Sequence, residues 1–318
     1  LAFAAVALTA VAGIKSTIKG NQKVTTEERT VDNFDAVSVS SGIDLYLTQG
    51  NTNTLKLEAD ENLMKHIKTE VKNGTLKIYS DETLSDAKSL KAHLTFKALE
   101  KISGSAGADV FTENTLKADE MKVNMSSGSD LKMTLESSEA NFNMSSGSDA
   151  IVKYTGKNLT INASSGSDFE INADELDELV LDMSSGSDVK LHGSAASLKV
   201  NASSGSDLDA FDFVAVNAII NASSACNAKI TMAGGNLTVN ASSASSVRYK
   251  GKVKNSRVNA RAFNVAIADI TASGAADVRI KVTEEISVSA SGASSVHYDG
   301  GAKIIRQDIG TVSTLRGN

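Results

Sequence analysis

The sequence repeats a five-residue word, Ser-Ser-Gly-Ser-Asp, at nearly constant spacing through the middle of the chain. A period of about 20 residues is typical of a solenoid, in which each repeat forms one coil that stacks on the preceding coil. Each repeated residue then forms a column along the stack, so the surface carries stripes of like side chains. The five intact words, separated by 19 or 20 residues, begin at Ser126, Ser145, Ser164, Ser184 and Ser203. Altered words begin at Ser40, Ser105, Ser223 and Ser242.

Apolar residues alternate with polar residues on both sides of each word. Alternation with a period of two predicts β-strands with one buried face. The alternating residues around the first intact word are Met121, Val123, Met125, Leu131, Met133 and Leu135. The absence of Pro from all 318 residues agrees with stacked strands, because Pro cannot donate to a sheet ladder. We therefore predict an all-β parallel solenoid, in which neighbouring coils bury their apolar sides together.

Two conformations of the word are open. If the strand continues through it, Ser127 and Ser129 would point inward, and Ser126, Gly128 and Asp130 outward. Alternatively, the chain turns sharply at Ser-Gly, because Gly adopts positive φ without cost and Ser and Asp favour turns. Inward hydroxyls would have to bond to one another or to the backbone. In both cases we expect a structural role for the glycines of the five words, Gly128, Gly147, Gly166, Gly186 and Gly205.

Two polar positions recur beside and within the words. An asparagine lies two residues before most words, with Asp182 in one of these positions, and an aspartate ends each intact word. On a continuous strand both would lie on one outer face, with successive coils about 4.8 Å apart. These columns are the candidate ligand-facing residues: Asn124, Asn143, Asn162, Asn201, Asp130, Asp149, Asp168, Asp188 and Asp207.

Several functions are compatible with such columns. A non-catalytic binding or adhesion module would contact a cell-surface glycan or protein through many weak polar contacts. Ca²⁺ bound by the five aspartates would relieve their mutual repulsion and stabilise a structural stalk, but the column decays to Asn227 and Ser246. A polysaccharide-active enzyme could use Asp130 and Asp149 at roughly 5 Å, although identical carboxylates do not provide a distinct acid and base. Ice binding by a flat Ser/Asn face would be disrupted by the aspartates.

We therefore expect a protein that is not an enzyme, has no cofactor and has no catalytic residues. The net charge of −6 and the absence of basic clusters argue against nucleic acid as a partner. The single Cys226 excludes an internal disulfide and stands where a word normally has Ser. The patterns specify neither a ligand nor an oligomeric state.

The first 13 residues are apolar and end in an Ala-x-Ala pattern at residues 10–12. This stretch is too short to span a bilayer, and it predicts the remnant of a secretory signal peptide with its leader over residues 1–19. The remainder, 20–318, is predicted to be one solenoid domain, with irregular initial coils at 20–110, regular repeats at 111–300 and a C-terminal cap at 301–318. A short helix is expected over 60–67, capped by Asp60.

Four segments together with the tandem words resemble a known family. They are Thr26 to Asp35, Val37 to Gly50, Leu57 to Leu63 and Glu70 to Ile78. Over roughly residues 20–300 the chain is similar to the putative auto-transporter adhesin, head GIN domain family, whose members occur in secreted and cell-envelope proteins of Bacteroidetes. The resemblance implies a right-handed parallel β-helix, here with about 19–20 residues per coil. It also implies secretion across the inner membrane, to the periplasm, the outer-membrane surface or the extracellular space.

Overall fold

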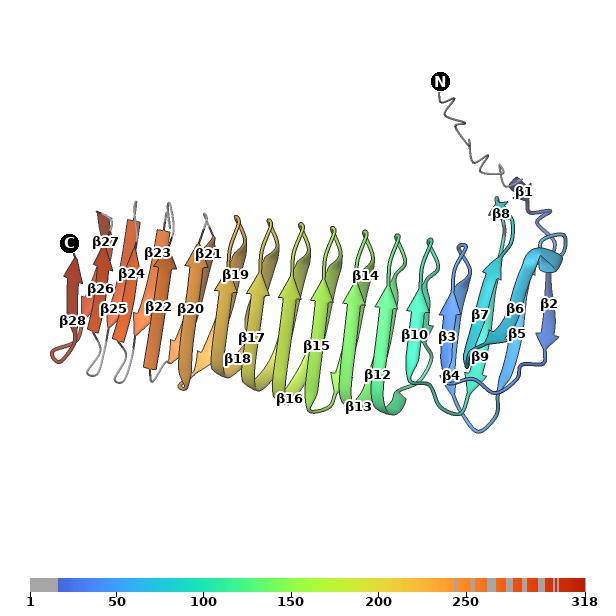
Figure 1. Ribbon diagram of the computed structural model, residues 1–318, viewed down its shortest axis with the longest axis horizontal. Helices are drawn as coiled ribbons and strands as arrows, with labels where there is room; N and C mark the ends of the chain where they lie inside the picture. Colours follow the sequence, from blue (N-terminus) through green and yellow to red (C-terminus); the bar gives the residue numbers. More distant parts are fainter. Residues whose placement is uncertain are drawn as a thin grey trace, which may run out of the picture.

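The computed structural model describes residues 17–242, 245–252, 255–261, 267–272, 277–281, 285–290, 295–299, 301 and 303–317. The described chain forms an elongated stack of flattened coils (Figure 1). From residue 101 onward the sequence runs along this stack in order, whereas residues 36–39 lie between residues 75–78 and 101–104. Successive coils pair through parallel strands, which confirms the predicted β-solenoid. The predicted leader lies outside the described residues as far as residue 16. No helix of the described residues is long and apolar enough to cross a membrane.

The strands divide into three groups along the stack. The first coils contain β1 (Thr17–Lys19), β2 (Val24–Arg29), β3 (Ala36–Val39), β4 (Asp44–Gln49), β5 (Thr54–Asp60), the 3₁₀ helix η1 (Met64–His66), β6 (Ile67–Lys72), β7 (Thr75–Ser80), β8 (Thr83–Ser85) and β9 (Leu90–Phe96). The regular coils contain β10 (Lys101–Gly104), β11 (Val110–Thr112), β12 (Leu116–Met125), β13 (Leu131–Met144), β14 (Asp149–Thr155), β15 (Asn158–Ala163), β16 (Asp168–Met183), β17 (Asp188–Ala202) and β18 (Asp207–Ala222). The last coils contain β19 (Asn227–Ala233), β20 (Asn236–Ser242), β21 (Ser246–Lys252), β22 (Asn255–Arg261), β23 (Ile267–Ala272), β24 (Asp277–Lys281), β25 (Glu285–Ala290), β26 (Ser295–Asp299), β27 (Lys303–Ile309) and β28 (Thr314–Gly317).

Each regular coil contains two strand segments, one that leads to the word and one that follows it. In β13, residues 131–136 pair with β14, whereas residues 139–144 pair with β15, and both pairings are parallel. The two kinds of segment form two layers that face each other (Figure 1). We call the outer surface of the segments before the words (121–125 and its equivalents) the Asn face. The outer surface of the segments after the words (130–135 and its equivalents) is the Asp face.

The space between the two layers is filled by the predicted alternating residues. All six that flank the first intact word are at most 3% exposed. Phe142 from one layer meets Phe169 from the other edge-on, with ring centroids 5.3 Å apart. Because each coil is one strand thick, an apolar side chain is shielded mainly by its equivalents in the coils above and below.

The word forms a sharp turn, as the second of the two predicted conformations requires. Ser127 and Gly128 have φ of 56° and 65°, so the chain passes through two consecutive left-handed residues and reverses direction, as in a type I′ turn. The continuous-strand prediction is therefore wrong for Ser127, which is exposed, whereas Ser129 does point inward and is 0% exposed. The turns also stack, since the Gly128 amide donates to the Ser146 carbonyl at 3.1 Å.

Where its hydroxyl is hydrogen-bonded, the inward serine joins its word to the preceding coil. The Ser129 hydroxyl accepts a hydrogen bond from the Ser126 amide at 3.0 Å and donates to the Gly104 carbonyl at 3.1 Å. The same pair of bonds recurs at Ser148. The buried hydroxyls therefore bond to the backbone and not to one another, so the row costs little desolvation energy where both bonds form.

The N-terminal end of the stack departs from the parallel pattern. Strand β5 pairs antiparallel with β2 and β9, and β6 pairs antiparallel with β7. The expected helix over 60–67 is reduced to η1, and Asp60 does not cap it. Asp60 is instead fully buried at the end of β5, where its carboxylate accepts hydrogen bonds from the amides of Gln22 and Lys88 at 2.7 and 3.0 Å. Helix capping was predicted wrongly because the backbone partners of Asp60 come from distant loops.

Candidate functional site

The turn separates the two predicted columns. The asparagines lie near the end of the strand segment that leads to the word. The aspartates, which end the word, lie after the turn and on the opposite layer. The structure therefore places Asn124, Asn143, Asn162 and Asn201 on the Asn face, and the five word aspartates on the Asp face. No ligand could contact both columns through one flat strand surface, as the continuous-strand interpretation had allowed.

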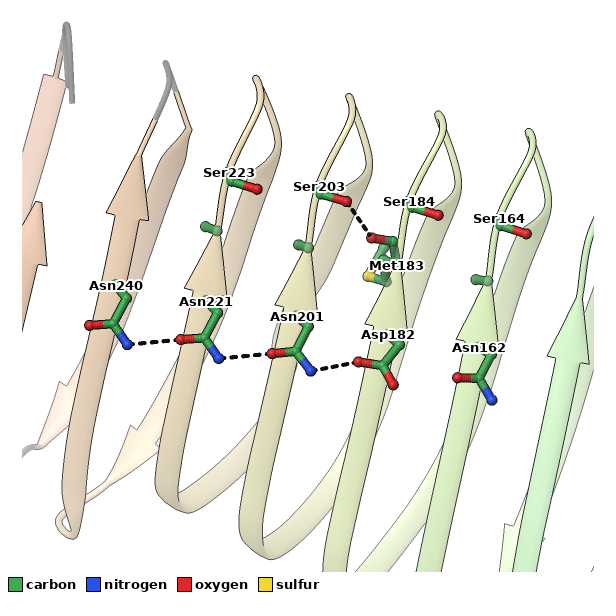
Figure 2. A pocket seen from close by; sticks show the side chains of 13 residues that line it. Asn162, Ser164, Asp182, Met183, Ser184, Asn201, Ser203, Asn221, Ser223 and Asn240 are labelled. Carbon is green, nitrogen blue, oxygen red and sulfur yellow. Dashed lines mark hydrogen bonds between the residues drawn. The ribbon is translucent and has the colours of Figure 1, made fainter. Parts of the chain in front are cut away.

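The asparagines are hydrogen-bonded to one another along the stack. Each side-chain amide donates toward the N-terminal end, with Asn143 donating to Asn124 and Asn162 to Asn143 at 2.9 Å in both cases. The pattern resumes farther along (Figure 2), where Asn221 donates to Asn201 and Asn240 to Asn221, both at 2.8 Å. Each of the linking asparagines thus uses one N–H and one oxygen lone pair inside the column, and it retains a second N–H and a second lone pair.

The column changes at Asp182. Asn201 donates to the Asp182 carboxylate at 2.5 Å (Figure 2). Asp182 pairs in register with Asn162 of the preceding coil, but an ionised carboxylate has no hydrogen to donate to the Asn162 oxygen. No hydrogen bond joins these two side chains. Sequence reasoning put Asp182 in this column but did not include it among the candidate ligand residues.

A groove of about 880 Å³ runs along the Asn face over this part of the column. One side is formed by the column residues and the other by the first serine of each word, which is half-buried. Figure 2 shows the serine row beside the Asn162 to Asn240 row, with both rows crossing several coils. The residues that form the two sides include Asn162, Asp182, Asn201, Ser164, Ser184 and Ser203.

The Asp face carries a longer carboxylate column than predicted. Asp44 and Asp109, from two of the altered words, stack in register ahead of Asp130. Partial burial, reinforced by repulsion from the neighbouring aspartates, raises the pKa of Asp130 and of Asp188. The pKa of Asp44 is also raised by burial and by Asp109, while Lys91 opposes the shift. The presence of Asp in the altered words was the available signal for these two additional members.

On the Asp face, the outward-facing residue two positions after the end of the word alternates between acidic and basic from Glu170 to Lys229. Glu170 lies 3.8 Å from Lys190, and Asp209 lies 3.5 Å from Lys229. These exposed pairs contribute little stability individually. No group of three or more His, Cys, Asp or Glu side chains that could hold a metal ion occurs among the described residues. The proposed Ca²⁺ column therefore stays a prediction without a preformed cluster to support it.

An aromatic stack lies on the outer side of the first coils and was not foreseen. The Tyr46 ring stacks on His93 at 4.9 Å and on Phe111 at 5.1 Å between centroids. The three residues are far apart in sequence and meet only because β9, β4 and β11 pair in register. Since both faces of the Tyr46 ring are covered, the stack offers ring edges to solvent and a poor platform for a sugar ring.

The sequence profile of the family described as putative auto-transporter adhesin, head GIN domain, matches residues 33–177, 151–253 and 254–302. The chain belongs to this family. Two solved structures similar to this GIN domain protein are a putative adhesin from Parabacteroides merdae and a putative adhesin from Parabacteroides distasonis. Both are 16% identical to it, with TM-scores of 0.50 and 0.51. The alignments cover 95% of this chain and 99% or 100% of the neighbours, and at this identity they establish the common fold. No curated protein matches the chain.

The chemistry available on this GIN domain is recognition through hydrogen bonds and charge. The Asn face offers amides and hydroxyls along a groove, and the Asp face offers exposed carboxylates in a row. The aspartates Asp130 and Asp149 have like surroundings in consecutive coils, so the repeat does not distinguish an acid from a base. The family is described as a putative auto-transporter adhesin and both solved neighbours as putative adhesins.

Proposed function

We propose that this protein is a non-catalytic adhesion module of the cell surface or of the secreted fraction. In this proposal the groove of the Asn face binds an extended glycan. The observation that carries the proposal is the double row of side-chain amides and hydroxyls along that groove, in which Asp182 takes the place of one amide. Membership in a family of adhesins supports the general role.

The polar groups of the groove are held in place before a ligand arrives. The amide ladder fixes the asparagine side chains, and the stacked turns fix the backbone of the serine row. A ligand would therefore not have to order these side chains, which reduces the entropic cost of weak contacts. Because several coils offer the same groups, an extended polymer could make many such contacts at once, which raises its apparent affinity.

A glycan fits this groove better than an apolar peptide segment. The groove is lined by Asn, Ser and Asp182 together with small or inward-facing Ala and Met residues, and none of its described lining residues is aromatic. Hydroxyl groups both donate and accept hydrogen bonds, so they match the second N–H and the second lone pair of the linking asparagines Asn201 and Asn221.

Substitutions on the two faces would test the proposal. Ser184→Arg places a long side chain in the groove, and Ile151→Arg adds the same side chain on the Asp face at a residue that is 58% exposed. Both purified variants should keep the far-ultraviolet circular dichroism of the parent. On a glycan array, Ser184→Arg should lose the parent's signals and Ile151→Arg should retain them. The proposal fails if the parent binds no glycan, or if both variants bind as the parent does.

A further inference from the structure

We infer that the position between the Asn162 and Asp182 side chains of consecutive coils, which we call the step, is a subsite for a protonated amine on the bound glycan. This inference rests on the proposed function and adds a class of sugar to it. Asp182 stands in a position that Asn occupies in the coils on either side, so it interrupts the amide ladder. The Asn162 oxygen faces the Asp182 carboxylate across the step (Figure 2). Two hydrogen-bond acceptors thus face each other with no donor between them.

The negative charge of the groove is carried by Asp182. Asp182 is the only charged residue among those that line the groove in the described chain. It forms no ion pair among the described residues, and its single side-chain partner is the neutral Asn201. The half-buried position of Asp182 reduces solvation of its carboxylate, which strengthens an interaction with a cation above that of a fully exposed carboxylate.

The geometry favours an ammonium over the other possible occupants. An ammonium group has three donors and no acceptor, so it can bond to the carboxylate and to the Asn162 oxygen together. Ser164 and Ser184, on the other side of the groove, offer hydroxyl oxygens beside the same step. An N-acetyl group has one N–H and no charge. Ca²⁺ would require about six to eight oxygen ligands, more than one carboxylate and its neighbours provide.

The substitution Asp182→Asn removes the charge and restores the repeat. The new amide would donate to the Asn162 oxygen and still accept from Asn201, as in the neighbouring coils. The matched control is Asp168→Asn, which removes one carboxylate from the Asp face. Calorimetric titrations would use a fully deacetylated glucosamine oligomer, its N-acetylated counterpart and a neutral glucose oligomer of the same length. All measurements would be made below about pH 7, where the glucosamine amines are largely protonated.

The parent and Asp168→Asn should bind the glucosamine oligomer at least tenfold more tightly than the other two oligomers. Asp182→Asn should lose this preference and keep the weaker binding of the uncharged oligomers. If the preference survives in Asp182→Asn, or falls equally in Asp168→Asn, the amine subsite is wrong while glycan binding stands. Loss of the preference on addition of EDTA would also overturn it, in favour of a bound cation.

A second measurement separates the subsite from polymer binding. Monomeric glucosamine should shift the side-chain amide resonances of Asn162 and Asn201 in the parent, and N-acetylglucosamine should shift them much less. If these shifts occur and no oligomer binds, the proposed glycan-binding groove is wrong and the amine subsite stands. If neither monomer causes a shift, the amine subsite is overturned whatever the oligomers do.

Discussion

Replacing one aspartate in the middle of the carboxylate column should stabilise the solenoid. Asp188 stacks in register between Asp168 and Asp207. The same column already contains the substitution that we propose, since Asn227 follows Asp207 and donates to its carboxylate at 2.8 Å. Asp188→Asn should form the equivalent bond to Asp168. The variant therefore removes two repulsive neighbours and adds one hydrogen bond without changing the shape of the side chain.

The size of the effect follows from the coil spacing. Two unit charges about 5 Å apart repel by roughly 0.8 kcal/mol in water, and exposed groups are close to that limit. Screening by salt and outward rotation of the side chains reduce the sum for two neighbours to about 1 kcal/mol. A new hydrogen bond adds about 0.5–1.5 kcal/mol. We expect the free energy of unfolding of Asp188→Asn to exceed that of the parent by about 1.5–2.5 kcal/mol.

The pH dependence provides an independent check on the cause. Partial burial and repulsion raise the pKa of Asp188 in the folded state above its value in the unfolded chain. The ionised carboxylate therefore destabilises the fold at neutral pH, and this penalty is relieved as the pH falls through the folded-state pKa toward the unfolded value of about 3.9. The advantage of Asp188→Asn should be largest near neutral pH and should shrink on acidification or at high salt.

Urea unfolding followed by circular dichroism would measure the effect for the parent, Asp188→Asn and the control Asp119→Asn. Asp119 is exposed and lies outside the column, so its replacement should change the free energy of unfolding by less than about 0.5 kcal/mol. The reasoning is refuted if Asp188→Asn is no more stable than the control near neutral pH. It is also refuted if the difference between the two variants does not depend on pH.

Three further predictions concern the turn, the buried hydroxyl row and the thiol. Gly166→Ala should cost about 1 kcal/mol, because its φ is 67° but a Cβ would meet no atom within 4 Å. Gly193→Ala should cost far more, because its Cβ would lie 2.0 Å from a backbone oxygen; equal losses in urea unfolding would contradict both values. Ser148→Ala should cost about 1–3 kcal/mol, since its hydroxyl joins two backbone groups. Ser206→Ala should be nearly neutral, since that buried hydroxyl has no partner, and similar unfolding curves for the two would reject this role of the row. Cys226 donates to a carbonyl as the serines do, and burial raises the pKa of its thiol. Cys226→Ser should therefore keep stability within about 1 kcal/mol, and the native thiol should react with maleimide much more slowly than the thiol in urea.

The fold was predictable because its determinants are local and repeated. Alternation around the words identified the residues from Met121 to Leu135 as β-strand on both sides of the word, and the six alternating apolar side chains are buried as expected. The path through the word was not predictable, because the apolar alternation on both sides of the word is compatible with a continuous strand and with a turn. Only Ser127 distinguishes them, and a serine can adopt either a strand or a left-handed conformation. The turn then decides that the Asn and Asp columns lie on opposite faces.

The candidate site was predictable as columns but not as interactions. The spacing of Asn124 and its equivalents implied an exposed ladder, yet it did not reveal that the amides bond to one another. The aromatic stack required knowledge of which strands pair, since Tyr46 and Phe111 are brought together by the register of β4 and β11. Alternation assigns a side chain to a face; its neighbours across the sheet depend on how the less regular first coils are connected.

A ladder of identical residues limits how a solenoid can recognise a ligand. Each asparagine that bonds to the next one uses part of its hydrogen-bonding capacity within the column. Every such coil then offers a ligand the same remaining donor and acceptor. Such a surface can hold a polymer at several equivalent registers, so it contributes affinity but little discrimination. Discrimination requires a coil whose side chain differs from its neighbours. On the Asn face that coil contains Asp182, where the ladder cannot close and one charge enters an otherwise neutral groove. Selectivity should therefore depend on the residue that breaks the repeat more than on the residues that make it.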